Sequence, residues 1–149
     1  MEETKTEPDI TANAILKPLC SHTVPSHPRY IRFLRKYLFE LALDMGFAYR
    51  DAVNIKAAFV EALNNVIEHA YKGKTDMPIN LDFYRYDDRL EIIIRDYGKK
   101  VPRSEIKSRD MSEYQDGGLG VFLMEKLMDY VDYDTTVDAG TRLKMVKKL

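Results

Sequence analysis

Apolar residues recur three or four positions apart along two stretches in the first half of the chain, which is the spacing of one face of an α-helix. The first stretch, which contains Tyr30, predicts a helix that ends at Gly46. Ser26 is expected to cap the N-terminus of this helix, and Pro28 suits its first turn. The second stretch begins a few positions after Gly46 and predicts one long helix that continues to Gly73.

The second predicted helix has an apolar face and a polar face. The apolar arc consists of Ile55, Phe59, Ala62, Leu63, Val66, Ile67 and Ala70. The opposite face carries Glu61, Asn65, Glu68 and Lys72, with His69 at its edge. Because Glu61 and Asn65 are four positions apart, their side chains project from successive turns of the same face. On periodicity alone, a solvated polar face is the simpler interpretation.

Apolar and polar residues alternate over residues 79–94, interrupted by a turn at Asp87. This period of two predicts a hairpin of two half-buried strands that ends at Asp96. An earlier strand is expected within residues 10–20, where Pro18 favours a position at the edge of the sheet.

The last third of the chain is expected to contain a loop, a helix and a closing hairpin. Residues 99–117 are polar and lack a clear period, which predicts a long mobile loop. The helix is marked by Leu119, Phe122, Leu123 and Leu127. Strands at 131–137 and 141–148 then form a hairpin, with Leu143 and Met145 facing the core. Because helices and strands come in blocks, the pattern favours an α+β fold of two layers, with helices on one face of a mainly antiparallel sheet.

Composition limits the classes of protein that this chain can represent. Its 149 residues fit one domain, with residues 10–149 folded and the polar residues 1–9 forming a flexible N-terminus. The net charge of −1 provides no basic field for direct nucleic-acid binding, and no apolar run approaches the roughly 20 residues that span a membrane. The acidic N-terminus has no signal-peptide pattern, so we expect a cytoplasmic protein. One cysteine excludes an intramolecular disulfide, and three histidines form no zinc-like cluster.

Several polar residues suit the chemistry of a nucleotide site. Asn65 offers a neutral amide oxygen, a hard ligand that Mg²⁺ accepts. Glu61, one helical turn earlier, suits a group that accepts or orients the proton of an attacking hydroxyl in phosphoryl transfer. Asp96 ends a predicted strand, where its carboxylate can accept a hydrogen bond from an amino group such as that of adenine. Gly98 lets the backbone approach a flat ring without an intervening Cβ.

A glycine-rich turn follows in the sequence. Gly117, Gly118 and Gly120 lead into the third predicted helix, and a helix N-terminus favours an anionic phosphate. Each motif has a simpler interpretation when taken alone. An Asp-x-Gly sequence is more often a turn, a Gly-Gly-x-Gly sequence is more often a flexible joint, and Thr141 is an ordinary strand residue. Together, the motifs specify a metal ligand, a proton acceptor, a carboxylate that recognises the adenine base and a loop that binds phosphate.

In that order the motifs resemble those of the anti-sigma-factor serine-protein kinases of bacterial partner switching, which belong to the histidine-kinase-like ATPase superfamily. The similarity extends from about Val24 to the C-terminus. It is carried by Glu61-Ala62 through Asn65 to His69-Ala70-Tyr71, by Asp96-x-Gly98, and by Gly117-Gly118-Leu119-Gly120. The resemblance implies a two-layer α/β sandwich of the histidine-kinase-like ATPase type.

The resemblance also implies an activity, partners and residue roles. The ATP γ-phosphoryl group would be transferred to a serine or threonine of a small antagonist protein. The same kinase would otherwise bind a sigma factor and so regulate transcription, and a homodimer is expected. Asn65 would bind Mg²⁺, and Glu61 would act as the general base. The other residues implied to form the ATP pocket are Asp96, on adenine, with Gly98, Gly118, Gly120 and Thr141.

Lys100 departs from the pattern of the superfamily, in which a second glycine is common at this position. Lys99 and Lys100 can reach phosphates instead. This departure keeps open the alternative of a non-catalytic, nucleotide-gated binding module for a sigma factor or another regulator. A detached histidine-kinase catalytic domain is a third interpretation.

Overall fold

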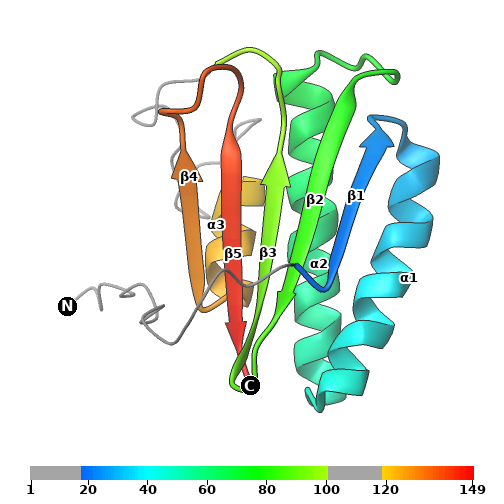
Figure 1. Cartoon of the computed structure of the whole chain (residues 1–149), viewed down its shortest axis with the longest axis vertical. Coiled ribbons are helices and arrows are strands. Elements are labelled where there is room, and N and C mark those ends of the chain that lie inside the picture. The colour runs from blue at the N-terminus through cyan, green and yellow to red at the C-terminus, as the bar shows by residue number, and fades with distance from the viewer. Residues whose placement is uncertain (1–17, 101–118) are drawn as a thin grey trace.

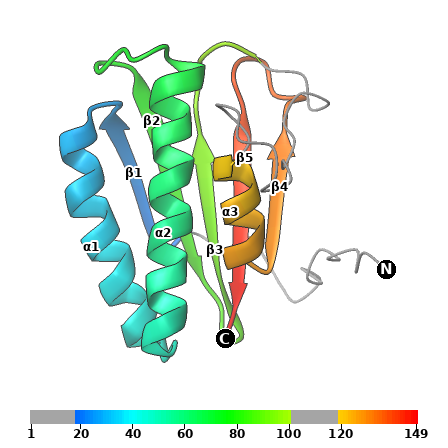
Figure 2. The same ribbon diagram turned by 180° about the vertical axis from the view of Figure 1, so that it is seen from behind.

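The computed structural model describes residues 18–100 and 119–149 (Figure 1). In chain order the elements are β1 (Cys20–Pro25), α1 (Pro28–Met45), α2 (Tyr49–Asn65), η1 (Val66–Ala70), β2 (Pro78–Arg85), β3 (Arg89–Arg95), α3 (Leu119–Leu127), β4 (Tyr130–Asp134) and β5 (Arg142–Lys148). The helices all cover one face of the sheet, as Figure 2 shows from behind. The expected α+β fold of two layers is confirmed. The predicted terminus at 1–9 and most of the predicted loop at 99–117 lie outside the described residues.

The five strands form one sheet in the order β1-β2-β3-β5-β4, and all neighbouring strands are antiparallel. Strand β5 lies between β3 and β4, with Ile94 opposite Leu143 and Arg95 opposite Arg142. This pairing brings the end of β3 beside the start of β5. The first described strand is at an edge, as expected, and spans Cys20–Pro25, whereas most of the range 10–20 in which it was expected lies outside the described residues. Pro18 therefore precedes the strand.

The N-cap of α1 differs from the prediction by one residue. His27 is the cap, and its Nδ1 accepts a hydrogen bond from the Arg29 N–H at 3.1 Å. Ser26 is fully buried, where its hydroxyl donates to the Lys74 carbonyl and accepts from the Met77 N–H at 3.1 Å. The prediction was wrong because Ser26 hydrogen-bonds to the chain before β2 and leaves the helix terminus to its neighbour.

The end of α1 and the start of α2 follow the sequence pattern, whereas the end of the second helix does not. Gly46 ends α1 in the left-handed conformation, with φ of 98°. Helix α2 ends at Asn65, and the chain continues through the π-helical turn η1, in which the Tyr71 N–H donates to the Val66 carbonyl at 3.0 Å. The predicted continuous helix to Gly73 is therefore wrong: helical structure ends at Ala70, and its last turn is a π-turn.

The hydrophobic core lies between the sheet and the helices. Its largest fully buried side chains are Leu38, Ile55, Phe59, Leu63, Ile79, Leu81, Phe83, Leu90, Ile92, Ile94, Met124 and Met128. The predicted apolar arc of α2 faces this core, and Phe59 meets Phe83 of β2 edge to face. Within residues 18–100 and 119–149, no helix has the length and hydrophobicity needed to cross a membrane.

Helix α3 forms where it was predicted, but different side chains anchor it. Met124 and Met128 fill the core, whereas Leu119 and Leu123 are exposed. The flexible methionine side chains fit the irregular space between α2 and the sheet. The helix therefore packs through a narrower face than the leucine spacing indicates.

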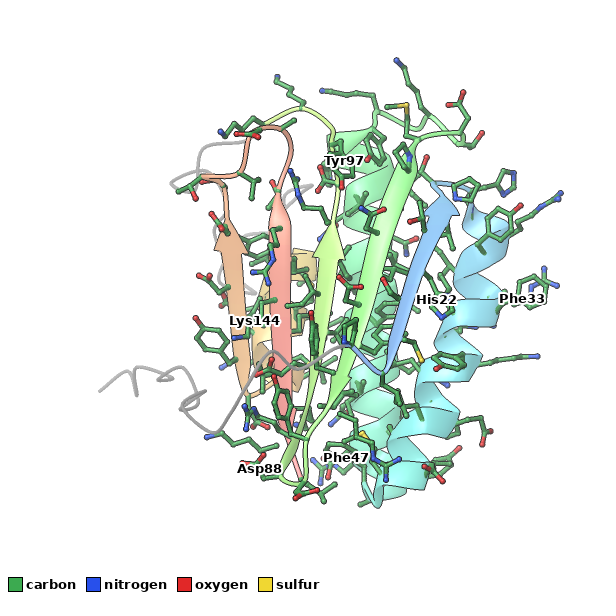
Figure 3. All side chains as sticks on the ribbon, in the orientation of Figure 1. His22, Phe33, Phe47, Asp88, Tyr97 and Lys144 are labelled. Atoms are coloured by element: carbon green, nitrogen blue, oxygen red, sulfur yellow. The ribbon has the colours of Figure 1, made fainter. Side chains whose placement is uncertain are left out.

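Strand β3 is buried on both faces, although alternation predicted a half-buried strand. On the face away from the helices, Arg89 is 6% exposed and Glu91 is 4% exposed. The Arg89 Nε donates to the Glu91 carboxylate at 3.1 Å, and the Lys144 Nζ lies 3.9 Å from the same oxygen (Figure 3). Because an unpaired buried charge is strongly unfavourable, this ion-pair cluster makes the burial of Glu91 possible.

Candidate functional site

The polar face of α2 meets the start of α3 at Gly120. A Cβ placed on this glycine would lie 3.1 Å from the Asn65 Nδ2 and 3.1 Å from the Glu61 Oε2. Three of the residues selected from the sequence are thus close neighbours. Any larger residue at position 120 would press on both polar side chains.

The polar side-chain atoms of Glu61 and Asn65 are available to a ligand. Both side chains are partly exposed, and in the described part of the chain neither makes a hydrogen bond or ion pair. An amide and a carboxylate side by side, next to a residue without a side chain, can therefore bind an external ligand. Among the described residues no group of three or more His, Cys, Asp or Glu side chains could hold a metal ion. This donor set fits Mg²⁺, which usually takes one or two protein ligands and receives the rest from water and phosphates.

Asp96 forms the centre of a second group of candidate residues. It follows β3 and is 5% exposed, and burial raises the pKa of its carboxyl above the ordinary value. The Gly98 N–H donates to the Asp96 Oδ1 at 3.0 Å, and backbone hydrogen bonds from Gly98 and Thr141 oppose the rise in the pKa. The Asp96 N–H in turn donates to the Thr141 carbonyl at 3.0 Å. Pairing of β3 with β5 therefore places Thr141 beside Asp96.

Two glycines permit close backbone contacts around Asp96. A Cβ on Gly98 would overlap the carbonyl group of Ala70 at the end of η1, and would lie 2.9 Å from the Ala70 Cβ. Gly140 has φ of 63°, and a Cβ there would overlap the backbone of Asp96. In the sequence, Gly140 lies in the turn of the closing hairpin and forms a Gly-Thr pair with the candidate residue Thr141. The signal for its closer role is its place directly before Thr141.

The π-turn connects the two groups. Asn65 is the last residue of α2, and Ala70 ends η1, which directly follows α2. The Ala70 carbonyl accepts a hydrogen bond from the Lys99 N–H at 3.1 Å. The segment after Asp96 is therefore attached to the same helical element that carries Glu61 and Asn65.

Sequence reasoning missed the side chains that hold this region together. The Tyr71 hydroxyl accepts a hydrogen bond from the Tyr97 N–H at 2.8 Å and donates to the Pro78 carbonyl. The Lys100 Nζ donates to the Val137 carbonyl at 2.9 Å, so the structure directs Lys100 to the loop between β4 and β5. No residue pattern marks such contacts, because their acceptors and donors are largely backbone groups.

Gly118, the remaining candidate, lies outside the described residues. Figure 3 shows Tyr97, which follows Asp96, at the end of the sheet where β3 terminates. Of the seven candidates, the structure brings Glu61, Asn65 and Gly120 into one group and Asp96, Gly98 and Thr141 into another.

Comparisons with known proteins identify similar chains. A family model described as the histidine kinase-like ATPase domain matches residues 24–147. The serine-protein kinase RsbW of Bacillus pumilus is 35% identical over 137 residues, covering 85% of this chain and 83% of that protein. The serine-protein kinase RsbW of Listeria monocytogenes is 34% identical over 132 residues, covering 83% of each protein.

Solved structures share the fold at low identity. The RsbU and RsbW domains of a Mycobacterium tuberculosis protein superimpose with a TM-score of 0.62 at 18% identity, covering 89% of this chain and 33% of that chain. A histidine kinase domain from a blue-light-activated kinase of Erythrobacter litoralis gives a TM-score of 0.54 at 16% identity, covering 84% of this chain and 61% of that chain. The two-layer fold is therefore shared with both.

Proposed function

The chain belongs to the histidine kinase-like ATPase domain family and to its RsbW serine-protein kinases, and on this basis we infer that it is an ATP-dependent protein serine/threonine kinase. It transfers the γ-phosphoryl group of ATP to a serine or threonine hydroxyl of a protein substrate. The observation that carries this proposal is the group formed by Glu61, Asn65 and Gly120, in which two polar side chains that have no hydrogen-bond or ion-pair partner among residues 18–100 and 119–149 lie beside a residue without a side chain.

Within this group, the two side chains have different roles in phosphoryl transfer. The Asn65 amide oxygen would hold Mg²⁺, which would supply positive charge beside the phosphate oxygens. The Glu61 carboxylate orients the acceptor hydroxyl and takes its proton as the hydroxyl oxygen attacks the γ-phosphorus. Gly120 leaves space for both side chains, and Gly118 lies just before it in the glycine-rich sequence.

The second group recognises the base. Asp96 accepts a hydrogen bond from the adenine amino group, Gly98 allows the ring to approach the backbone, and Thr141 lies beside Asp96, directly before the neighbouring strand β5. Because the carboxylate is mostly buried, its hydrogen bond to a ligand is strengthened by the low local dielectric.

The resemblance of the motifs supports specific partners. The substrate is a small antagonist protein, and the kinase binds a sigma factor when it does not hold that antagonist. It works as a homodimer in the cytoplasm. Phosphorylation of the antagonist thereby decides which partner is bound.

Phosphoryl transfer to a candidate antagonist tests the proposal directly. The protein is incubated with labelled ATP, Mg²⁺ and the antagonist, and label is expected on a serine or threonine. Glu61→Gln should retain ATP affinity and lose transfer by at least about a hundredfold, the scale of general-base catalysis. Glu68→Gln, an exposed carboxylate in η1, is the matched control and should transfer at the wild-type rate.

Two results would count against the kinase assignment. Equal rates for Glu61→Gln and the wild type would remove Glu61 from the role of base. Measured ATP binding without transfer to any antagonist would identify the protein as a non-catalytic, nucleotide-gated binding module instead.

A further inference from the structure

Arg95 is the last residue of β3 and directly precedes Asp96. Successive side chains of a strand point to opposite faces. Ile94 faces the core, so Arg95 lies on the face away from the helices, behind the segment that carries Asp96. None of the motifs that indicate a nucleotide site includes this arginine.

The residues proposed to recognise the base, Asp96, Gly98 and Thr141, are called the base-recognition group. The Arg95 guanidinium connects the two strand ends that form this group. Its Nη1 donates to the carbonyl of Asp96 and to the carbonyl of Ala139, and lies 3.4 Å from the carbonyl of Thr141. The first acceptor belongs to the end of β3, and the other two belong to the turn that leads into β5. One side chain therefore fixes the position of Asp96 relative to Thr141.

Tyr97 completes the support behind Asp96. The Arg95 guanidinium lies 4.5 Å from the centre of the Tyr97 ring, a cation–π contact. The Asn80 Nδ2 donates to the Tyr97 hydroxyl at 2.6 Å, and the Tyr97 N–H donates to the Tyr71 hydroxyl at 2.8 Å. The residues on both sides of Asp96 are thus held from the sheet and from the helix end.

We propose that Arg95 is a positioning residue for adenine recognition, which fixes Asp96 and Thr141 against each other without touching the nucleotide. This inference rests on the proposed function, because it assigns a role within the same ATP site. The charge of Arg95 also opposes the effect of burial on the pKa of Asp96, which favours the ionised carboxylate that accepts from an amino group.

An arginine suits this role better than a lysine. The planar guanidinium presents several N–H donors in a fixed geometry and can stack on an aromatic ring at the same time. A lysine would retain the positive charge and lose both the fixed donor geometry and the stacking. Comparison of arginine with lysine at position 95 therefore distinguishes the effect of donor geometry from the effect of positive charge.

The experiment compares Arg95→Met and Arg95→Lys with the matched control Arg142→Met. Arg142 is the cross-strand partner of Arg95, is exposed, and contributes the same charge at the same end of the sheet. Dissociation constants are measured by calorimetry with Mg²⁺ for ATP, GTP and inorganic tripolyphosphate, and each variant's Tm is recorded. Initial rates of transfer supply KM for ATP and kcat.

For both Arg95 variants we expect ATP affinity to fall roughly tenfold, the scale of losing one or two net hydrogen bonds, with the preference for ATP over GTP reduced. Affinity for tripolyphosphate should stay within twofold of the wild type, and KM for ATP should rise with little change in kcat. Arg142→Met should match the wild type. Arg95→Lys keeps the charge, so it tests positioning even if Arg95→Met lowers the Tm.

Two results would overturn the inference. One is an unchanged preference for ATP over GTP in both Arg95 variants. The other is an equal loss of affinity for ATP and tripolyphosphate, which would indicate a general structural role. Failure of the wild-type protein to bind ATP would refute the proposed function itself. This result can be told apart from failure of the Arg95 inference because it is obtained with the wild type alone.

Discussion

Gly98 lies directly on the carbonyl group of Ala70, so the segment after β3 and the π-turn after α2 touch backbone to backbone. The contact is reinforced by the hydrogen bond from the Lys99 N–H to the Ala70 carbonyl, at 3.1 Å. It joins the base-recognition group to the helix that carries the proposed metal ligand. The geometry of the site therefore depends on this contact as much as on any charged side chain.

Gly98→Ala should lower both stability and ATP affinity. The added Cβ would overlap the Ala70 carbonyl, and overpacking of this kind typically costs about 1–3 kcal/mol. Urea denaturation and calorimetry with ATP measure the two effects. Gly73→Ala is the control: its φ of 80° imposes strain, but no atom lies within 4 Å of the new Cβ. Stability should fall there while ATP affinity is retained; normal ATP binding by Gly98→Ala would contradict the prediction.

Gly120→Ala should separate stability from activity. Gly120 lies in α3, where alanine is favoured over glycine by up to about 1 kcal/mol, so the Tm should hold or rise. The new Cβ would lie 3.1 Å from both the Asn65 amide nitrogen and a Glu61 oxygen, which forces these side chains to move. We expect slower phosphoryl transfer and weaker Mg²⁺-ATP binding. Full activity in this variant would show that the contact is unimportant.

Asn65→Ala should weaken ATP binding only when Mg²⁺ is present. Loss of the amide ligand is expected to reduce the binding free energy by about 2 kcal/mol, the scale of a charge-assisted contact. Titrations in Mg²⁺ and in EDTA measure the difference. If both conditions gave the same loss, Asn65 would act on the nucleotide and not on the metal.

Asp96→Asn should be more stable than the wild type at neutral pH and bind ATP less well. Burial raises the pKa of the Asp96 carboxyl above its ordinary value of 3.8, so the folded state disfavours the ionised form. The penalty is absent at a pH below 3.8 and develops as the pH rises through the raised pKa. The stability difference between variant and wild type should therefore grow from acid to neutral pH. A constant difference in unfolding free energy across this range would exclude the assignment.

Glu91→Gln should destabilise the fold by about 1–3 kcal/mol, because it removes the carboxylate that the buried side chains of Arg89 and Lys144 share. Asp44→Asn is the matched control, since it breaks the exposed ion pair to Arg85 at 2.9 Å and should change stability by less than about 1 kcal/mol. Urea denaturation at neutral pH measures both. Equal effects would mean that the cluster on β3 contributes no more than a surface pair.

The sequence predicted the helices and hairpins well because their signals are local. Gly46 ends α1, and the alternation of apolar and polar residues identified β2 and β3. Both signals depend on the types of only a few adjacent residues. The burial of Glu91 was missed because alternation cannot register ion pairs between strands. The π-turn was missed because the spacing of hydrophobic residues is compatible both with one more turn of α-helix and with a five-residue π-helical turn.

The candidate site was only partly accessible to sequence reasoning. Glu61 and Asn65 were recognised because they share a helix face. Their contact with Gly120 depends on the packing of α3 on α2, which motif order indicated but no spacing rule specifies. Arg95 was missed because its acceptors are backbone carbonyls, and every residue type carries a carbonyl.

The position of β5 in the sheet has a consequence for the order in which the protein acquires its activity. A ribosome makes β5 after every other strand described, yet this strand inserts between β3 and β4, and its pairing with β3 places the preceding Thr141 beside Asp96. Strand β3 cannot pair with β5 until β5 has been synthesised. Strand pairing over a long sequence separation also generally slows folding. Newly made chains should thus remain unable to bind ATP until β5 has been synthesised, and bound nucleotide would then stabilise the completed sheet.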